Sequence, residues 1–502
     1  MYSEPVVTLP APRILIKIGF MAAITALAGW GAHLIGLAPQ PLAVVAVCTF
    51  VSVICTTLFF WTHRVAVAFL GVAVLIGSRA MTLHGMLRAT ELDIIFFLVG
   101  MMVIVGALKD LGFLTWIIQS ILNRKRMTGT SFTVILCFLS ALLSSVVDEV
   151  SSIVVVLALV FQVCDTLKIK PTPFVLIAVL CTNIGSAATM LGNPVGIFIG
   201  NKAGFNFSQF LAGASPIAFV SLCATLCVVL LWFRKPIHEM TEKMDEHRTA
   251  HHGLAPMIRI PYRRGLFVLL ATVAIIAFHH QIENILGLTG TENKNAFLII
   301  TPLIIAGLLM IYRPQQARHY IEHDVEWWTL LFFMLLFSIA GSLEEQGITR
   351  NLALRLSEQV NGGPRAMTPL VLLISSLGSA FVDNIVFVAA FTPVIQTLVE
   401  RSAEFSILWW ALLFGACFGG NITAIGSTAN IVALGLLEKR GHQHVAFFEW
   451  LKIGVLVGLI TGLIAWGMLS VMTMPQPVRQ PARESVVEGP VHEPHLSPVP
   501  TS

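Results

Sequence analysis

Charged residues are scarce in this chain. Asp, Glu, Lys and Arg make up 12% of its 502 residues, whereas hydrophobic residues make up 56%. Soluble globular domains are about one quarter charged, so the composition is not that of an ordinary soluble protein. Many windows of about 20 residues are almost wholly apolar, and that is the length needed to cross the hydrocarbon core of a bilayer. We therefore expect an all-α polytopic membrane protein.

Several other features are missing. Residues 1–12 have no run of positive charge, so no cleaved signal peptide is expected. The eight cysteines form no CxxC or Cys/His spacing, which favours packing over metal binding. A thiol site for a soft ion such as arsenic(III) or copper has modest support from Cys223 and Cys227, one helical turn apart. No HExxH, Walker or Ser/His/Asp pattern and no basic face occurs, so we expect no enzyme, no cofactor and no nucleic-acid partner.

Two related stretches interrupt the apolar sequence. The first, residues 140–194, contains SSVVDEVSS and NIGSAATMLGNP; the second, about 235 residues later, contains SAFVDNIV and GGNITAIGSTAN. Asp148-Glu149 and Asp383-Asn384 fall in the middle of apolar runs. Ionisable residues at bilayer depth are expensive, so their default interpretation is functional. Paired interruptions in corresponding halves are typical of a transporter's binding site.

The flanking charges favour a re-entrant hairpin over one long helix for the apolar run from residue 130 to 165. Arg124–Arg126 precede this run, and Lys168 and Lys170 follow it, so both ends prefer the cytoplasm. A segment that enters and leaves on one side must turn inside the membrane, and its polar tip is tolerated where it faces protein or a wet cavity. A second hairpin is expected over residues 366–399.

An offset of 235 residues relates the two halves. Gly106 and Gly341, Gly112 and Gly347, and Asp148 and Asp383 are separated by it. We expect about eleven transmembrane helices in two inverted repeats, each with a re-entrant hairpin and an interrupted helix. The predicted segments are a leader helix in residues 1–37, a first repeat in 38–235, a cytoplasmic connecting loop in 236–264, a second repeat in 265–473 and a disordered tail in 474–502.

The positive charges also predict an orientation. Arg64, Arg234, Arg263 and Lys439-Arg440 are expected on one face with Arg124–Arg126, and the cytoplasmic side is the one enriched in Lys and Arg. Three arginines are expected on the other face and partly violate this rule: Arg355, Arg365 and Arg401. The N-terminus is then cytoplasmic and the C-terminal tail external, in a bacterial inner (plasma) membrane. The sequence leaves open whether the protein, whose partners are the lipid bilayer and a small ion, forms a homodimer.

The polar clusters have the chemistry of an ion site. Asn, Ser and Thr oxygens together with carbonyls freed by Gly and Pro suit a hard cation such as sodium, and carboxylates at that depth can carry protons. The competing hypothesis is that the acids only cap helices. Neighbours on a helix point about 100° apart, so Glu149 is expected to matter less than Asp148. The candidate binding residues, with sodium as the possible metal, are Asp148, Glu149, Asn183, Gly185, Ser186, Thr189, Gly192, Asn193, Asp383, Asn384, Gly420, Asn421, Thr423, Gly426, Ser427 and Asn430.

The motif order resembles the ion transporter superfamily. An amphipathic segment, a hairpin tip with DE or DN, and a span with NIGSAATMLGNP or GGNITAIGSTAN follow one another twice over residues 40–472. This superfamily includes citrate-transporter-like permeases, sodium/proton antiporters of the NhaD type and arsenite exporters of the ArsB type. Glu149 stands where an amide is commoner, and neither tip has the Ser-Asn-Thr signature of the sodium/dicarboxylate symporters. The resemblance implies a secondary active transporter.

Two functions remain after this comparison. The first is a cation (sodium)/proton antiporter, with sodium or protons as the coupling ion. The alternative is a permease or exporter of a small anion or neutral oxo-species, such as a citrate-like carboxylate or arsenite. No Arg or Lys occurs in either hairpin tip or interruption, which favours a cationic or neutral substrate. Helix N-termini bind anions without arginine, so the alternative stays open.

Overall fold

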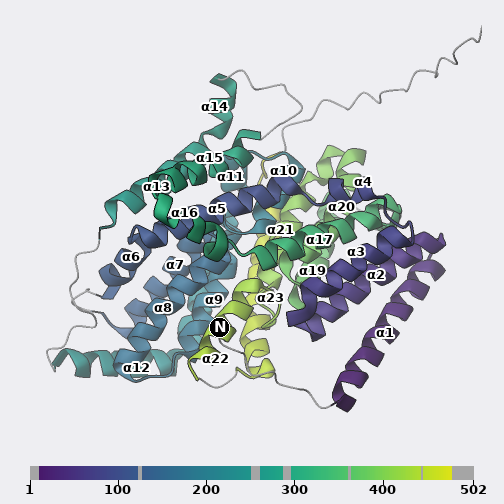
Figure 1. Cartoon of the computed structure of the whole chain (residues 1–502). Coiled ribbons are helices and arrows are strands. Elements are labelled where there is room, and N and C mark those ends of the chain that lie inside the picture. Colours follow the sequence, from purple (N-terminus) through teal and green to yellow (C-terminus); the bar gives the residue numbers. More distant parts are fainter. Residues whose placement is uncertain are drawn as a thin grey trace, which may run out of the picture.

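The structure is a computed structural model that describes residues 11–122, 127–249, 261–285, 296–359, 363–441 and 445–476. Its described residues fold into helices with no β-strand (Figure 1). Among these residues, eight helical segments are long and apolar enough to cross a membrane, and five shorter apolar helices accompany them. The prediction of an all-α polytopic membrane protein is confirmed.

The helices fall into two corresponding series. The first series is α5 (Leu92–Asp110), α6 (Phe113–Leu122), α7 (Gly129–Val146), α8 (Glu149–Leu167), α9 (Thr172–Ser186), α10 (Pro194–Ala203) and α11 (Phe207–Trp232). The second series is α17 (Trp327–Glu345), α18 (Ile348–Gln359), α19 (Gly363–Phe381), α20 (Asn384–Arg401), α21 (Ile407–Gly419), α22 (Thr428–Lys439) and α23 (Phe447–Val471). In each series two helices meet at an acidic tip, and an interrupted helix follows.

Other helices precede and connect these series. Those before the first are α1 (Ala11–Leu34), α2 (Pro41–Phe59), η1 (Trp61–His63), α3 (Arg64–Gly77) and α4 (Leu83–Ala89). Those between the two are α12 (Arg234–Thr249), α13 (Arg263–Ala277), α14 (His279–Ile285), α15 (Ala296–Tyr312), α16 (Pro314–His319) and η2 (Tyr320–Asp324). A short turn, η3 (Ala403–Ser406), leads into α21.

The tips of both helix pairs lie at mid-depth. The residues around Asp148 and Asp383 line one cavity with Phe97, Leu98, Met101 and Met102, in the middle of α5, which is itself part of an apolar spanning segment. The arms of the first pair are 18 and 19 residues long, or about 27 to 29 Å at 1.5 Å per residue. By length alone each arm could cross a bilayer, and the position of the tip beside the middle of α5 is what supports a re-entrant hairpin.

Contacts between helix ends define two faces of the molecule. On the first, which we call the α12 face, the Gly129 amide donates to Thr241 of α12 (3.0 Å), and Arg440 at the end of α22 pairs with Asp165 at the end of α8 (2.8 Å). On the opposite face, Gln209 at the start of α11 donates to the carbonyl of Gln476 after α23 (3.2 Å). Ser406, just before α21, also bonds Gln476.

The two series therefore run in opposite directions. The interrupted helix α9–α10 starts at the α12 face, because α9 follows the end of α8, and it leads to the opposite face at α11. The interrupted helix α21–α22 starts at the opposite face and ends at the α12 face. Figure 1 shows the same crossing, with α9 and α22 in the lower half and α10 and α21 above them. This antiparallel arrangement is the one expected for inverted repeats.

Two expectations differ from the structure. The connecting segment 236–264 was expected to be a loop, but its described N-terminal part is helical within α12, where Ile237, Met240 and Met244 are buried at helical spacing. Arg64 was expected at a membrane face, but it is 5% exposed. Arg124–Arg126, residues 250–260 and the tail after Gln476 lie outside the described residues.

Candidate functional site

The two aspartates at the hairpin tips cap the helices that follow them. Asp148 Oδ1 accepts hydrogen bonds from the amides of Val150 and Ser151, both at 2.8 Å, at the start of α8. Asp383 Oδ1 accepts one from the amide of Ile385 at the start of α20 (3.2 Å). These bonds satisfy amide groups that a helix leaves free at its N-terminus. Helix capping is thus one role of both aspartates.

Each interrupted helix restarts through a polar cap. Asn193 Oδ1 accepts from the Gly196 amide (2.8 Å), and Pro194 takes the first position of α10, where no amide is needed. Ser427 Oγ accepts from the Ala429 amide (3.2 Å) at the start of α22. The Gly-rich sequences around these caps therefore end one helix and start another inside the protein, as the sequence predicts.

Hydroxyl groups tie each hairpin to its interrupted helix in the same way. Ser144 donates to the carbonyl of Thr182 (2.8 Å), and Ser379 in the second series donates to the carbonyl of Ala416 (2.6 Å). Thr189 and Thr423 make matching bonds, to the carbonyls of Ser145 and Ala380 respectively. Side chains and freed carbonyls thus satisfy one another, as buried backbone requires.

Three buried asparagines join the two interrupted helices. Asn183 Nδ2 donates to the side-chain oxygens of Asn421 (2.8 Å) and Asn430 (2.9 Å). Asn430 Nδ2 in turn donates to the carbonyls of Gly420 (2.8 Å) and Thr423 (2.9 Å). All three side chains are at most 1% exposed. This network fixes the two interruptions against each other at the centre of the molecule.

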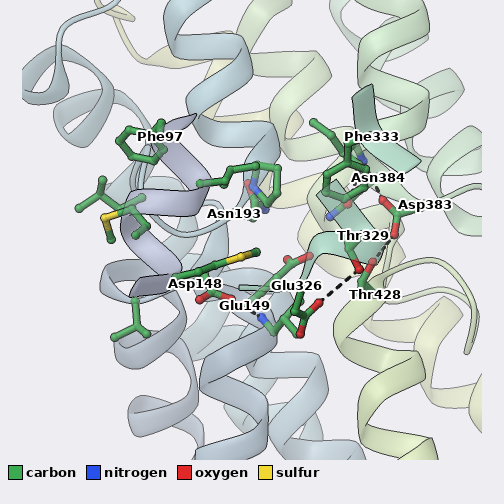
Figure 2. A pocket seen from close by; sticks show the side chains of 18 residues that line it. Phe97, Asp148, Glu149, Asn193, Glu326, Thr329, Phe333, Asp383, Asn384 and Thr428 are labelled. Carbon is green, nitrogen blue, oxygen red and sulfur yellow. Dashed lines mark hydrogen bonds between the residues drawn. The ribbon is translucent and has the colours of Figure 1, made fainter. Parts of the chain in front are cut away.

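The hairpin tips face a small cavity of about 40 Å³. In Figure 2, Asp148 and Glu149 lie on one side, Asp383 and Thr428 on the other, and Glu326 between them. Apolar residues of α5 and α17 complete the wall. The polar lining consists of Asp148, Glu149, Asn193, Glu326, Thr329, Asp383, Asn384 and Thr428. Four carboxylates from two hairpin tips and the start of α17 therefore converge on one space.

The four carboxylates differ in their partners. Asp383 Oδ2 accepts the Thr428 hydroxyl at 2.5 Å, and Glu326 Oε2 accepts that of Thr329 at 3.3 Å. Asp148 is committed to backbone amides through one oxygen. Glu149 is 2% exposed, and its Oε2 has no hydrogen-bond partner among the described residues. A buried carboxylate oxygen without a partner is costly, so Glu149 is the acid most in need of a proton or cation.

The structure brings only some of the predicted site residues to the cavity. Asp148, Glu149, Asn193, Asp383 and Asn384 line it, so both members of the first acidic pair face the same space despite being helix neighbours. The remaining residues build the interrupted helices around it: Asn183, Gly185, Ser186, Thr189, Gly192, Gly420, Asn421, Thr423, Gly426, Ser427 and Asn430.

Sequence reasoning missed Glu326, Thr329 and Thr428, which line the cavity, and the burial of Arg64. Glu326 had a readable signal, because it lies 235 residues after Glu91, the same offset that relates Asp148 to Asp383. Thr428 directly follows the GGNITAIGS run and was available as a candidate. Arg64 had no signal, since an arginine at the end of an apolar span is normally read as a membrane-surface residue.

Transition-metal chemistry has little support in this cavity. Within the described ranges no three His, Cys, Asp or Glu side chains are grouped closely enough to hold a metal ion. The donors that converge here are carboxylate, amide and hydroxyl oxygens, which suit hard cations.

Comparison with known proteins gives the family. The family model described as "Citrate transporter" matches residues 50–415. The chain belongs to the citrate transporter family. An uncharacterized transporter of Mycobacterium tuberculosis is 31% identical over 436 residues, which cover 84% of this chain and 97% of the relative. The predicted resemblance to citrate-transporter-like permeases is therefore confirmed, and the protein is a membrane transporter.

Two further similarities are more distant. The P protein of Homo sapiens is 26% identical over 475 residues, which cover 79% of this chain and 56% of that protein. The crystal structure of the Alcanivorax borkumensis YdaH transporter, described as having an unusual topology, matches with a TM-score of 0.52 and 16% identity. It covers 79% of this chain and 88% of the solved chain, so this member of the citrate transporter family shares its fold.

Proposed function

We propose that the protein is a secondary active transporter that exchanges a small cation, sodium in the first instance, for protons. The observation that carries this proposal is the convergence of four carboxylates on a cavity of about 40 Å³. A water needs roughly 10–15 Å³ of such volume, so the space suits an ion with a few waters. Protonated carboxylates and a bound cation can alternate in it, because each removes the repulsion between the acids.

The size of the cavity also bears on the substrate. Benzene occupies an engineered cavity of roughly 150 Å³, and citrate is larger than benzene. The acidic cavity in this conformation is therefore too small for a tricarboxylate, and its negative charge repels one. Both properties favour a cation over an organic anion at this position.

A carboxylate permease is the second candidate. The family description names citrate, and the buried guanidinium of Arg64 supplies a positive charge near the tips. In this function the acids would bind the coupling ion, and the substrate would bind elsewhere along the path. The neutral oxo-species arsenite remains a third substrate to include in the test.

Transport by the purified protein in proteoliposomes decides between these functions. The pH gradient and the sodium gradient are varied independently, with a pH-sensitive dye inside the vesicles and labelled citrate or arsenite as alternative substrates. Exchange predicts proton movement driven by a sodium gradient without an organic substrate. Citrate uptake that depends on either gradient, without sodium-driven proton movement, contradicts exchange and supports the permease.

A further inference from the structure

Arg64 is a buried positive charge with no role in the site described so far. It is the first residue of α3, directly after η1, and its side chain is 5% exposed. Burial of an unpaired charge is strongly unfavourable, so a buried arginine requires negative charge nearby. The residues around its guanidinium show where that charge lies.

Two aromatic rings hold the guanidinium. Its central carbon lies 4.1 Å from the ring centroid of Trp61 and 5.3 Å from that of Phe332. Both rings line a second cavity of about 170 Å³ that has Asp383 as a shared wall with the acidic cavity. Contacts of this kind stabilise a desolvated cation without neutralising it. Arg64 itself lines neither cavity, but the rings that it contacts line the second one.

One hydrogen bond connects Arg64 to the acidic cavity. Its Nη2 donates to Thr329 Oγ1 (3.1 Å), and the Thr329 hydroxyl donates to Glu326 Oε2 (3.3 Å). The Arg64 Nε has no hydrogen-bond partner among the described residues. A guanidinium has five N–H donors, so the side chain keeps donors free to face a carboxylate.

The acidic side chains that interact with Arg64 belong to the acidic cavity. Asp383 and Glu326 interact electrostatically with Arg64, yet the ion pairs of the described residues include neither. Neither carboxylate makes a direct ion pair with the guanidinium, and Thr329 bridges it to Glu326. Both carboxylates line the acidic cavity, so they can exchange this indirect counter-charge for a cation bound there.

We propose that the guanidinium of Arg64 is a tethered counter-ion for Asp383 and Glu326, and that it competes with the transported cation for these two carboxylates. This inference rests on the cation exchange proposed above and adds a residue that sets its affinity. When the cavity holds no cation, Arg64 offsets part of the negative charge. When a cation enters, it repels the guanidinium and takes over that role.

Removal of this charge has a specific consequence for transport. In Arg64→Gln the cation meets no competitor, so its apparent KM falls by about tenfold or more, as expected for two like charges within about 12 Å at an effective dielectric constant of about 20. Vmax falls as well, because the cation is released more slowly. Arg64→Lys keeps the charge and is expected to restore KM towards the value of the unmodified protein.

Sodium-dependent proton movement in proteoliposomes gives the apparent KM for sodium and the Vmax of each variant. Arg440→Gln is the matched control, because it removes an arginine that is half-exposed and pairs with Asp165 at the α12 face. We expect its KM to be unchanged. An unchanged or raised sodium KM in Arg64→Gln overturns the proposal, because a purely structural arginine would lower the amount of active protein without tightening cation binding.

A second measurement does not depend on transport. Thermal unfolding of purified Arg64→Gln, Asp383→Asn and the double variant gives a double-mutant cycle. We expect the double variant to lose less stability than the sum of the single variants, since each single change leaves the other charge buried and uncompensated. Additive losses overturn the counter-ion role. If the unmodified protein moves no protons in response to sodium, the proposed exchange fails, while the cycle still reports on Arg64.

Discussion

At the scale of single residues, the acids of the site have different roles. Asp148 and Asp383 each stabilise the first turn of a helix, as the competing hypothesis of helix capping predicts. Glu149 caps nothing and has an oxygen without a partner in the described part of the chain. We therefore propose that Glu149 is the main carrier of the proton or cation, the reverse of the expectation that it matters less than Asp148.

Replacement of Glu149 by glutamine tests this reversal. Glu149→Gln keeps the size of the side chain but removes the titratable charge, so we expect sodium-dependent proton movement to be lost. Thermal stability should be unchanged or higher, because a neutral amide is less costly to bury than an unpaired carboxylate. Flux in proteoliposomes and the unfolding temperature are measured on the same purified sample.

The matched variants for this test are Asp148→Asn and Asp383→Asn. Asparagine caps helices about as well as aspartate, so both should fold. Asp148→Asn should keep its stability, whereas Asp383→Asn should lose some, because it leaves the buried Arg64 without one of its counter-charges. Full coupled flux in purified Glu149→Gln, with loss only in the two aspartate variants, would contradict the assignment of Glu149. Normal flux in all three would remove the carboxylate mechanism altogether.

At the scale of elements, the interrupted helices depend on close approach of backbone to backbone. A Cβ added at Gly426 would lie 2.8 Å from the carbonyl oxygen of Gly420 and 2.9 Å from that of Ser379. A Cβ at Gly192 would likewise meet the backbone of Ser186. Backbone atoms cannot swing aside as a side chain does, so glycine is required at these positions because of space.

Gly426→Ala should destabilise the protein and reduce transport, and Gly426→Leu should do so more strongly. Overpacking of this kind typically costs about 1–3 kcal/mol. Gly435→Ala is the control within the adjoining helix α22, because a Cβ there meets nothing within 4 Å. We expect it to be neutral or slightly stabilising. If Gly426→Ala and Gly435→Ala have the same unfolding temperature and the same flux, the interrupted helix tolerates a rearrangement of its backbone.

At the scale of the whole molecule, the basic residues at helix ends favour one orientation, with Arg401 as an exception. Three basic residues lie at helix ends on the α12 face: Lys168 after α8, Arg234 at the start of α12 and Arg440 after α22. Arg401, which bonds Ser357, lies on the opposite face, where α23 ends. The excess of Lys and Arg marks the cytoplasmic side in membrane proteins. We propose that the α12 face is cytoplasmic, with the start of α1 on this side and the chain after Gln476 on the other.

Cysteine labelling of intact cells tests this orientation. Ser502→Cys should react with a membrane-impermeant maleimide added from outside. Lys235→Cys in α12 should react only after permeabilisation. The chain has eight cysteines of its own, so the unmodified protein sets the background. Labelling of Ser502→Cys that requires permeabilisation would invert the topology.

The sequence by itself determined the membrane class, the two hairpins with acidic tips and the interrupted helices, because these depend on local properties. An apolar run of sufficient length enters the bilayer, and Gly, Pro and Asn end a helix wherever they occur together. The 235-residue offset made the repeat visible without any contact information. The same offset relates Glu326 to Glu91 and could have revealed a fourth acid.

Only the tertiary structure decided which of these residues meet. Arg64 is 265 positions from Thr329, and Asn183 is 238 positions from Asn421, so their partners cannot be inferred from neighbouring sequence. Segment 236–249 became helical because α12 packs its buried face on the first hairpin. The charge of the site depends on which buried groups meet across the two halves, since charges compensate one another only at short range in a low-dielectric interior.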